Sequence, residues 1–218
     1  MPYATLRDKK TELIRKARDG SAFLAPYAST AIVNLTSGAG ADLTALPTGY
    51  EDLGWTSTDG ASYGRATETS DVSSFGSVEP TRSDITSDRI TMGVTAQETK
   101  LLTLQLYTGA DLSTAQAAAT SGEFQIEKPA RPGFRYYRLL GLFVDDTDDG
   151  ELYVARFMPR ARVTEFGEQA FTDGADPISY PLTFTGYEDS VLGYSHKWFF
   201  GGPGWLALLA SMGIDQAT

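Results

Sequence analysis

The chain contains no cysteine and a single histidine among its 218 residues. Without cysteine it can form no disulfide bond, no thiolate metal site and no cysteine nucleophile, and nothing in the composition favours an oxidising compartment. Imidazole chemistry is limited to His196, and the neighbouring Ser195 would point to the opposite face of a strand, out of reach of that base. We therefore interpret His196 as a structural or surface residue and expect the protein to fold in the cytoplasm.

Positive charge is scarce, because 18 Lys and Arg stand against 28 Asp and Glu, which gives a net charge of −10. Such a composition argues against an ordinary DNA-binding surface, since affinity for phosphate needs concentrated positive charge. Residues 1–20 are the exception, with six basic and three acidic residues. Acidic residues interrupt this basic start, so it does not predict an export signal.

Long apolar runs are also missing. The longest charge-free apolar stretch, Trp198–Ile214, has 17 residues and is interrupted by glycine and proline. A helix that crosses a bilayer needs about 20 predominantly apolar residues. We expect no membrane span.

Motifs that carry metal or cofactor chemistry are incomplete. The acidic turn Asp145–Glu151 fails as an EF-hand loop, because position 3 would be Thr147 and position 12 would be Arg156. A looser calcium site there stays open, although a solvated hairpin tip explains the same residues. Gly38 and Gly40 are followed by no phosphate-loop lysine. We expect no catalytic residue, no cofactor and no metal.

Most of the chain alternates polar and apolar residues, the period of a strand with one buried face. This pattern predicts strands over 89–98 and 178–184. It also predicts a β-hairpin whose arms, 134–144 and 152–163, flank the acidic turn. On the second arm one face carries Tyr153, Ala155, Phe157, Ala161 and Val163, and the other carries the basic residues Arg156, Arg160 and Arg162.

Helical patterns are short. Residues 96–107 predict a strand that passes into a helix ended by Gly109, and residues 203–213 predict a C-terminal helix with proline at its start. Residues 1–20 are expected to form an arm or a helix. Residues 56–86, rich in Ser, Thr, Gly and Asp, predict a long loop that a partner orders. The simplest reading is one mainly β domain over residues 1–218.

Four segments, taken in order, resemble the major tail (tail tube) proteins of long-tailed bacteriophages, particularly those that infect actinobacteria. The first is a small-residue and apolar run that closes in Ala-Pro, and the second is a Leu-Gly-aromatic turn that ends in Asp-Gly. The third is a long polar segment, with Ser73, Phe75 and Glu79, that leads into a strand. The fourth is an aromatic, Gly-Pro and Trp ending. They span residues 20–26, 50–60, 66–94 and 199–205.

The resemblance implies a β-sandwich or partial barrel with one or two short helices and long stacking loops. Six copies would form a ring, and rings would stack into a tube around a tape-measure protein and end at tail-terminator proteins. Double-stranded DNA would pass through the lumen without specific binding. The protein would be part of the virion tail, assembled in the host cytoplasm.

Three groups of residues are expected to serve this assembly. The loop that stacks one ring on the next would use Trp55, Glu68, Phe75, Val78 and Glu79. A basic face between subunits would use Arg156, Arg160 and Arg162, paired with acidic residues of neighbouring copies. The C-terminal helix would pack through Trp205, Leu208 and Leu209.

Two other functions remain open on the residues alone. A carbohydrate-binding β-sandwich could use Trp55, Tyr63, Trp198 and Trp205 as stacking platforms, although aromatic residues also serve as core or interface residues. A hydrolase could use a carboxylate pair among the 28 acidic residues, but no particular pair is indicated. In the tube reading, the net negative charge predicts a lumen lined mainly by acidic and uncharged polar side chains, which repel the duplex and favour its transit.

Overall fold

The structure, a computed structural model, describes residues 2–128, 130, 133 and 135–217. It is mainly β, as the alternating pattern predicts. The strands are β1 (Asp19–Pro26), β2 (Thr36–Ser37), β3 (Asp42–Leu43), β4 (Glu51–Asp52), β5 (Thr56–Val72), β6 (Arg82–Ala96), β7 (Tyr137–Thr147), β8 (Gly150–Phe166), β9 (Tyr180–Gly186) and β10 (Lys197–Gly201). The helices are α1 (Leu101–Thr108) and α2 (Pro203–Met212), with two short 3-10 turns, η1 (Tyr3–Thr5) and η2 (Thr11–Leu13), near the N-terminus.

One antiparallel sheet dominates the molecule, in the order β4-β1-β7-β8-β9-β6-β5, with β10 also paired to β8. The sheet curls back on itself. Three strands separate β7 from β5 in the sheet order, yet Gly141 of β7 lies so close to the Tyr63 hydroxyl of β5 that a Cβ on this glycine would touch it. The rings of Tyr63 and Phe143 meet edge to face across this closure. The end strands β4 and β5 do not pair with each other, so the sheet forms a partial barrel that stays open.

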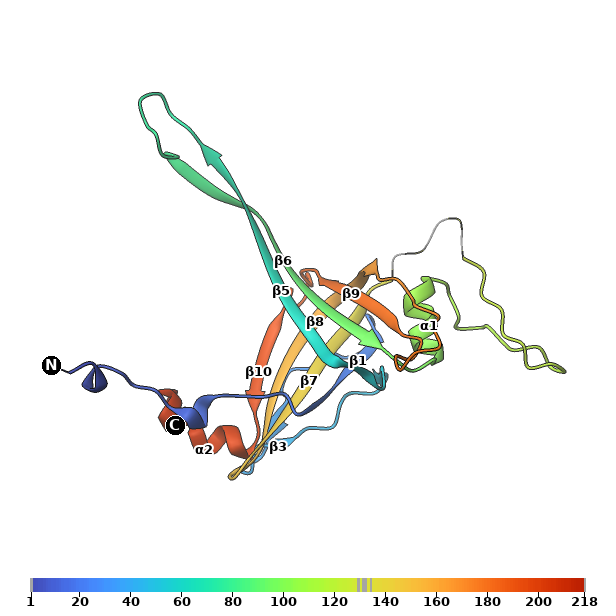
Figure 1. Ribbon diagram of the computed structural model, residues 1–218, viewed down its shortest axis with the longest axis horizontal. Coiled ribbons are helices and arrows are strands. Elements are labelled where there is room, and N and C mark those ends of the chain that lie inside the picture. The colour runs from blue at the N-terminus through green and yellow to red at the C-terminus, as the bar shows by residue number, and fades with distance from the viewer. Residues whose placement is uncertain (1, 129, 131–132, 134, 218) are drawn as a thin grey trace.

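The core inside the curl comes from alternate residues of neighbouring strands. Met92 on β6, Leu139 on β7, Met158 on β8 and Phe184 on β9 are fully buried together. Full burial of each such side chain stabilises the fold by about 1.5–3 kcal/mol. Helix α1 closes one end of the curl with Leu106, and Gly109, in the left-handed conformation, ends the helix as predicted (Figure 1).

The outer face of the same sheet carries a second core. Segment 27–50 covers this face, and its Ile32 and Leu35 pack against Leu140, Tyr153 and Phe157 from β7 and β8. Tyr50 at the end of the segment donates its hydroxyl hydrogen to the carbonyl of Thr30, which ties the segment to itself. Strands β7 and β8 are therefore buried on both faces, while strands near the sheet ends keep one exposed face.

The β7–β8 hairpin is confirmed, and its acidic turn is tighter than predicted. Thr147 pairs with Gly150, so only Asp148 and Asp149 lie between the strands. Strand β7 begins at Tyr137, and Phe134, which the prediction included in the first arm, lies outside the described residues. The strand predicted over 178–184 is also confirmed, although it begins at Tyr180 and Ile178 before it is exposed.

A β-bulge in β8 corrects the predicted faces of that strand. Leu139 pairs with Met158 but Tyr137 pairs with Ala161, so Pro159 and Arg160 form an extra step on β8. Proline suits this position because it has no N–H to give to the ladder. The bulge reverses the alternation, which places Arg156 on the face opposite to Arg160 and Arg162. The apolar residues divide in the same way, since Phe157 lies in the outer core and Ala161 in the inner one.

The prediction of a long loop over 56–86 is wrong, because this segment forms most of a β-hairpin. Strands β5 and β6 pair from Thr56–Ala96 out to Val72–Arg82, and only residues 73–81 form the turn. The half near the barrel is held by β9, which pairs with β6 from Ile90 to Ala96. The distal half is a two-stranded ribbon that projects far from the body (Figure 1). Its polar residues meet water on both faces, which removes the apolar alternation that would reveal a strand.

The chain ends lie together at one side of the molecule (Figure 1). Residues 2–18 form an extended arm with two 3-10 turns rather than a helix. Lys10 of the arm donates a hydrogen bond from Nζ to the carbonyl of Ser211 at 3.0 Å. Helix α2 is confirmed, with Pro203 in its first turn and Gly213 in the left-handed conformation at its end.

Candidate assembly surfaces

The turn of the β5–β6 hairpin presents apolar side chains to water. Phe75 and Val78 are fully exposed, and Val72 and Ile85 on the adjoining strands are also exposed. Glu68 and Glu79 are exposed on the same distal half. Soluble surfaces rarely gather apolar side chains on a projecting element unless a partner covers them.

Trp55 lies apart from the other residues assigned to the stacking loop. It stands just before β5, at the barrel end of the hairpin, where its backbone N–H donates to Oε1 of Glu98 at 2.7 Å. Lys100 forms an ion pair with the same carboxylate, and these contacts lower the pKa of Glu98, with the Lys100 hydrogen bond as the largest cause. Trp55 is largely exposed. The hairpin therefore carries exposed aromatic residues at both of its ends.

An aromatic cluster surrounds the guanidinium of Arg156. The guanidinium carbon lies 3.6 Å from the ring centre of Trp198, 5.4 Å from that of Phe200 and 5.8 Å from that of Tyr63. Phe200 in turn stacks on Trp205 of α2 with ring centres 4.8 Å apart. The structure thus brings three of the four predicted stacking platforms into one cluster, where Tyr63 and Trp198 contact Arg156 and Trp205 stacks on Phe200. Trp55 takes no part in this cluster.

His196 belongs to the same cluster. Its Nδ1 accepts a hydrogen bond from the indole N–H of Trp198 at 2.6 Å. Burial, with a smaller contribution from the positive charge of Arg156, lowers the pKa of His196 to about 4. The imidazole is therefore neutral near pH 7, its Nδ1 already accepts the Trp198 indole N–H, and its ring packs against Tyr63 and Trp198.

Arg160 and Arg162 face a different cluster on the other side of β8. The guanidinium of Arg160 lies 4.1 Å from the ring centre of Tyr136, and that of Arg162 lies 4.9 Å from the ring centre of Tyr187. The rings of Tyr136 and Tyr187 meet edge to face. Contacts of this kind contribute about 0.5–1 kcal/mol each when exposed and about 2 when desolvated. Sequence reasoning missed these tyrosines, although the position of Tyr136 between Arg135 and Arg138 was a usable signal.

A buried ion pair anchors this second cluster. Nη1 of Arg138 lies 3.5 Å from Oδ2 of Asp189, and both side chains are largely buried. Arg138 also donates to the carbonyls of Ser29 and Pro159. Asp189 accepts the backbone N–H groups of Val191 and Leu192. Because both partners are satisfied, this pair fixes the loop after β9 onto β7, and it was not predicted from the sequence.

A cavity of about 340 Å³, which we call the arginine cavity, lies beside the Arg156 cluster. Its walls come from the N-terminal arm, from the barrel end of β5 and from β7 and β8. Three basic residues line it: Arg15, Lys16 and Arg156. Asp59 and Asp145 also line it. Segments far apart in the sequence thus bring three cations to one opening.

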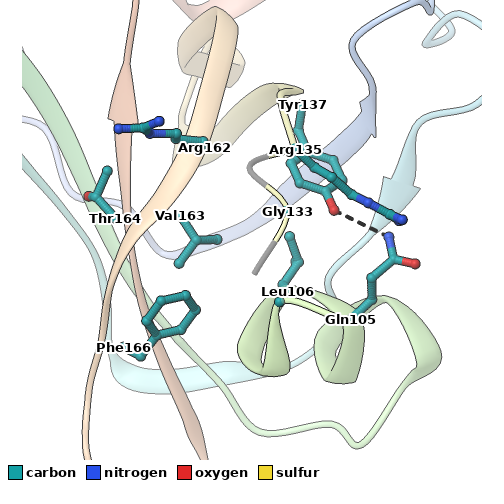
Figure 2. A pocket seen from close by; sticks show the side chains of 10 residues that line it. Gln105, Leu106, Gly133, Arg135, Tyr137, Arg162, Val163, Thr164 and Phe166 are labelled. Carbon is teal, nitrogen blue, oxygen red and sulfur yellow. Dashed lines mark hydrogen bonds between the residues drawn. The ribbon is translucent and has the colours of Figure 1, made fainter. Parts of the chain in front are cut away.

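A second cavity, of about 210 Å³, lies under α1 (Figure 2). Leu106, Val163 and Phe166 form its apolar wall, and Gln105 donates a hydrogen bond from Nε2 to the hydroxyl of Tyr137 at 3.2 Å. At its rim Arg135 pairs with Asp111. Hydrogen bonds from Ser113 and Arg135 lower the pKa of Asp111 to about 2, which keeps it ionised. Among the described residues that line it, no hydroxyl lies next to a histidine or a carboxylate that could act as its base.

The acidic turn of the β7–β8 hairpin is held by backbone contacts. Asp145 is buried, and its two carboxylate oxygens accept the N–H groups of Lys16 and Asp146. Glu151 accepts the hydroxyl of Tyr153, which raises the pKa of that tyrosine to about 12. Within the described residues, no group of three or more His, Asp or Glu side chains is placed to hold a metal ion.

Helix α2 places the predicted C-terminal packing residues at the edge of the sheet. It packs against β8 and β10, and Trp205, Leu208 and Leu209 are all half-buried. A Cβ on Gly204 would touch the carbonyl of Gly150, so the close approach of α2 to the β7–β8 turn requires glycine there. Over the described part of the chain, no helix is long and apolar enough to cross a membrane.

A family model described as "Phage tail tube protein" matches residues 9–199. No curated protein matches the chain. Among solved structures, the chain is similar to one titled "Crystal structure of Hcp protein", with a TM-score of 0.32 and 8% sequence identity over 82% of this chain and 98% of that chain.

Proposed function

The chain belongs to the phage tail tube protein family, and on this premise we propose that it forms hexameric rings that stack into the tail tube of a long-tailed phage of actinobacteria. The tube surrounds a tape-measure protein, meets tail-terminator proteins at its end and later conducts double-stranded DNA. Subunits assemble in the host cytoplasm and function in the virion tail. The role is structural and involves no catalysis.

The projecting β5–β6 hairpin is the observation that carries this proposal. An isolated two-stranded hairpin is at best marginally stable in water, because one pair of strands buries little apolar surface. The distal half of this hairpin nevertheless exposes Phe75 and Val78. A neighbouring subunit that covers these side chains supplies the missing burial. We assign the contact between successive rings to this distal half, with Glu68 and Glu79 at its margin.

Open strand edges support lateral association within a ring. Strands β4 and β5 end the sheet order, and each has one hydrogen-bonding edge that no described strand of the chain occupies. Unpaired edges favour strand addition by another chain. Copies joined by a head-to-tail contact close into a ring when the rotation between them closes. The Tyr136–Arg160 and Tyr187–Arg162 contacts are assigned to this lateral interface.

The net charge supports passage of DNA rather than its binding. Six copies with a net charge of −10 each would give every ring a charge of −60. We propose that the lumen is lined mainly by acidic and uncharged polar side chains, which do not retain phosphate. Arg156, Arg160 and Arg162 then lie away from the lumen, at contacts between subunits.

Electron microscopy of the purified protein tests the proposal, with light scattering over a wide concentration range as the second measurement. Rings or tubes of uniform diameter are expected, and averaging of the rings should show sixfold symmetry. A monomeric mass at every concentration, with no rings or tubes, would contradict the proposed function. Deletion of Glu68–Glu79 should abolish tubes but leave the barrel folded, as measured by its far-UV circular dichroism. Normal tubes from this variant would show that the distal hairpin is dispensable.

A further inference from the structure

The arginine cavity contains basic groups that the monomer leaves unsatisfied. Nη1 of Arg156 and Nη2 of Arg15 are each buried and have no hydrogen-bond partner among the described residues. Both side chains line the same cavity. Neither forms an ion pair within the described part of the chain. A guanidinium carries five N–H donors and no acceptor, so its natural partner is a carboxylate or another anion.

The two carboxylates of the cavity do not fill this role. Both oxygens of Asp145 already accept backbone N–H groups, from Lys16 and Asp146. Asp59 is exposed to solvent and forms no ion pair among the described residues. The cavity therefore retains an uncompensated charge at the guanidinium of Arg156.

The stability of the monomer does not account for the placement of Arg156. Burial lowers the pKa of Arg156, which shows that its surroundings disfavour the charged form. Contact with the Trp198 ring offsets part of this cost, but buried charges are normally retained only where a counter-charge is also present. Arg138 on the neighbouring strand shows the satisfied case, with Asp189 and two carbonyls as partners.

The distal β5–β6 hairpin carries the complementary groups. Asp84 and Asp88 on this hairpin pair with Arg82 and Arg65. The remaining acidic residues of the distal half are exposed and have no ion pair among the described residues: Glu68, Asp71 and Glu79. The distal half of the hairpin projects away from the body (Figure 1), whereas the cavity is lined by the barrel end of β5.

From this complementarity we infer that the arginine cavity is a carboxylate-binding site, and that its occupant is Glu68, Asp71 or Glu79 from the hairpin of a second copy. The inference rests on the proposed function, since it names the receiving site for the contact between rings. A hairpin of one copy that enters a cavity of the next makes a head-to-tail contact, which extends in one direction without closing. Such a contact produces a stack.

Replacement of Arg156 by methionine separates an assembly role from a structural one. Arg156→Met removes a charge without a partner in the monomer, so the monomer should unfold at the same or a higher temperature. Tube assembly should need about a tenfold to hundredfold higher protein concentration, because a charge-assisted hydrogen bond is lost at every contact. Arg156→Lys keeps the charge in a different geometry. The protein concentration that this variant needs for tube assembly should lie between those of Arg156→Met and the natural protein.

Charge exchange identifies the occupant. Arg156→Glu should block tubes, and one of Glu68→Lys, Asp71→Lys or Glu79→Lys in the same chain should restore them. Asp84→Lys is the matched control, because Asp84 lies on the same hairpin but already pairs with Arg82. This control should restore nothing. Inorganic phosphate provides a further arm, in which the melting temperature of the monomer is measured with and without the anion.

The outcomes are distinct. If the natural protein forms no rings or tubes, the proposed function fails. If it forms tubes and Arg156→Met assembles at the same concentration, only this inference fails. A lower melting temperature of the Arg156→Met monomer would also overturn it, because the residue would then be structural. Restoration by none of the three lysine variants, together with stabilisation of the natural monomer by phosphate, would assign the cavity to a free anion and overturn the hairpin as occupant.

Discussion

The two apolar side chains at the hairpin turn provide a sharp test of the stacking contact. Phe75 and Val78 are fully exposed, so neither contributes packing to the monomer. The double variant Phe75→Ser with Val78→Ser should therefore leave the midpoint of monomer unfolding unchanged. Any effect on tubes must then come from the contact between copies.

The expected loss follows from the apolar surface that the contact would bury. Full burial of a Phe or Val side chain is worth about 1.5–3 kcal/mol, so the two together account for about 3–6 kcal/mol at each contact. Because each 1.4 kcal/mol changes an equilibrium constant tenfold, the double variant should need at least about a hundredfold higher concentration to form tubes.

Sedimentation of tubes over a series of protein concentrations measures this threshold, and circular dichroism of the same samples measures monomer stability. The matched control is Phe171→Ser with Val191→Ser, which removes the same side-chain types from exposed positions outside the hairpin. The control should assemble at the concentration of the natural protein. If the hairpin variant also does so, the assignment of the stacking contact to this turn is wrong.

Three further predictions concern the fold that carries these surfaces. Arg138→Met leaves Asp189 buried without its cation, so chemical denaturation should show a loss of about 3–5 kcal/mol, and no loss would mean that the pair is not coupled. The pKa of His196 is about 4 in the folded protein, against an ordinary value of 6.5, so between these two pH values the unfolded chain binds more protons than the folded one. The free energy of unfolding should therefore fall by on the order of 1–2 kcal/mol as the pH drops from 7 to 5. In the His196→Gln variant this contribution to the pH dependence of stability should be absent. Gly141→Ala forces a methyl group against the Tyr63 hydroxyl and Met92 across the barrel closure, which should cost about 1–3 kcal/mol, whereas an unchanged unfolding midpoint would show that β5 moves away freely.

Local patterns in the sequence determined the elements of the barrel. The alternation in β6 and β9 predicts strands because each has one buried face, and Met92 and Phe184 occupy the buried positions. The hairpin turn before Gly150 and helix α2 between Pro203 and Gly213 follow from backbone preferences that act within a few residues. These features need no knowledge of distant contacts, which is why the sequence alone was sufficient for them.

The tertiary structure decided which residues meet. The distal halves of β5 and β6 have water on both faces, so no apolar period marks them as strands, and only their pairing with each other shows the hairpin. The bulge at Pro159 and Arg160 depends on the register between β7 and β8, and it moves Arg156 away from Arg160 and Arg162. The arginine cavity joins the N-terminal arm to β5, β7 and β8. Such contacts depend on how the whole sheet curls, and local patterns in the sequence do not show that curl.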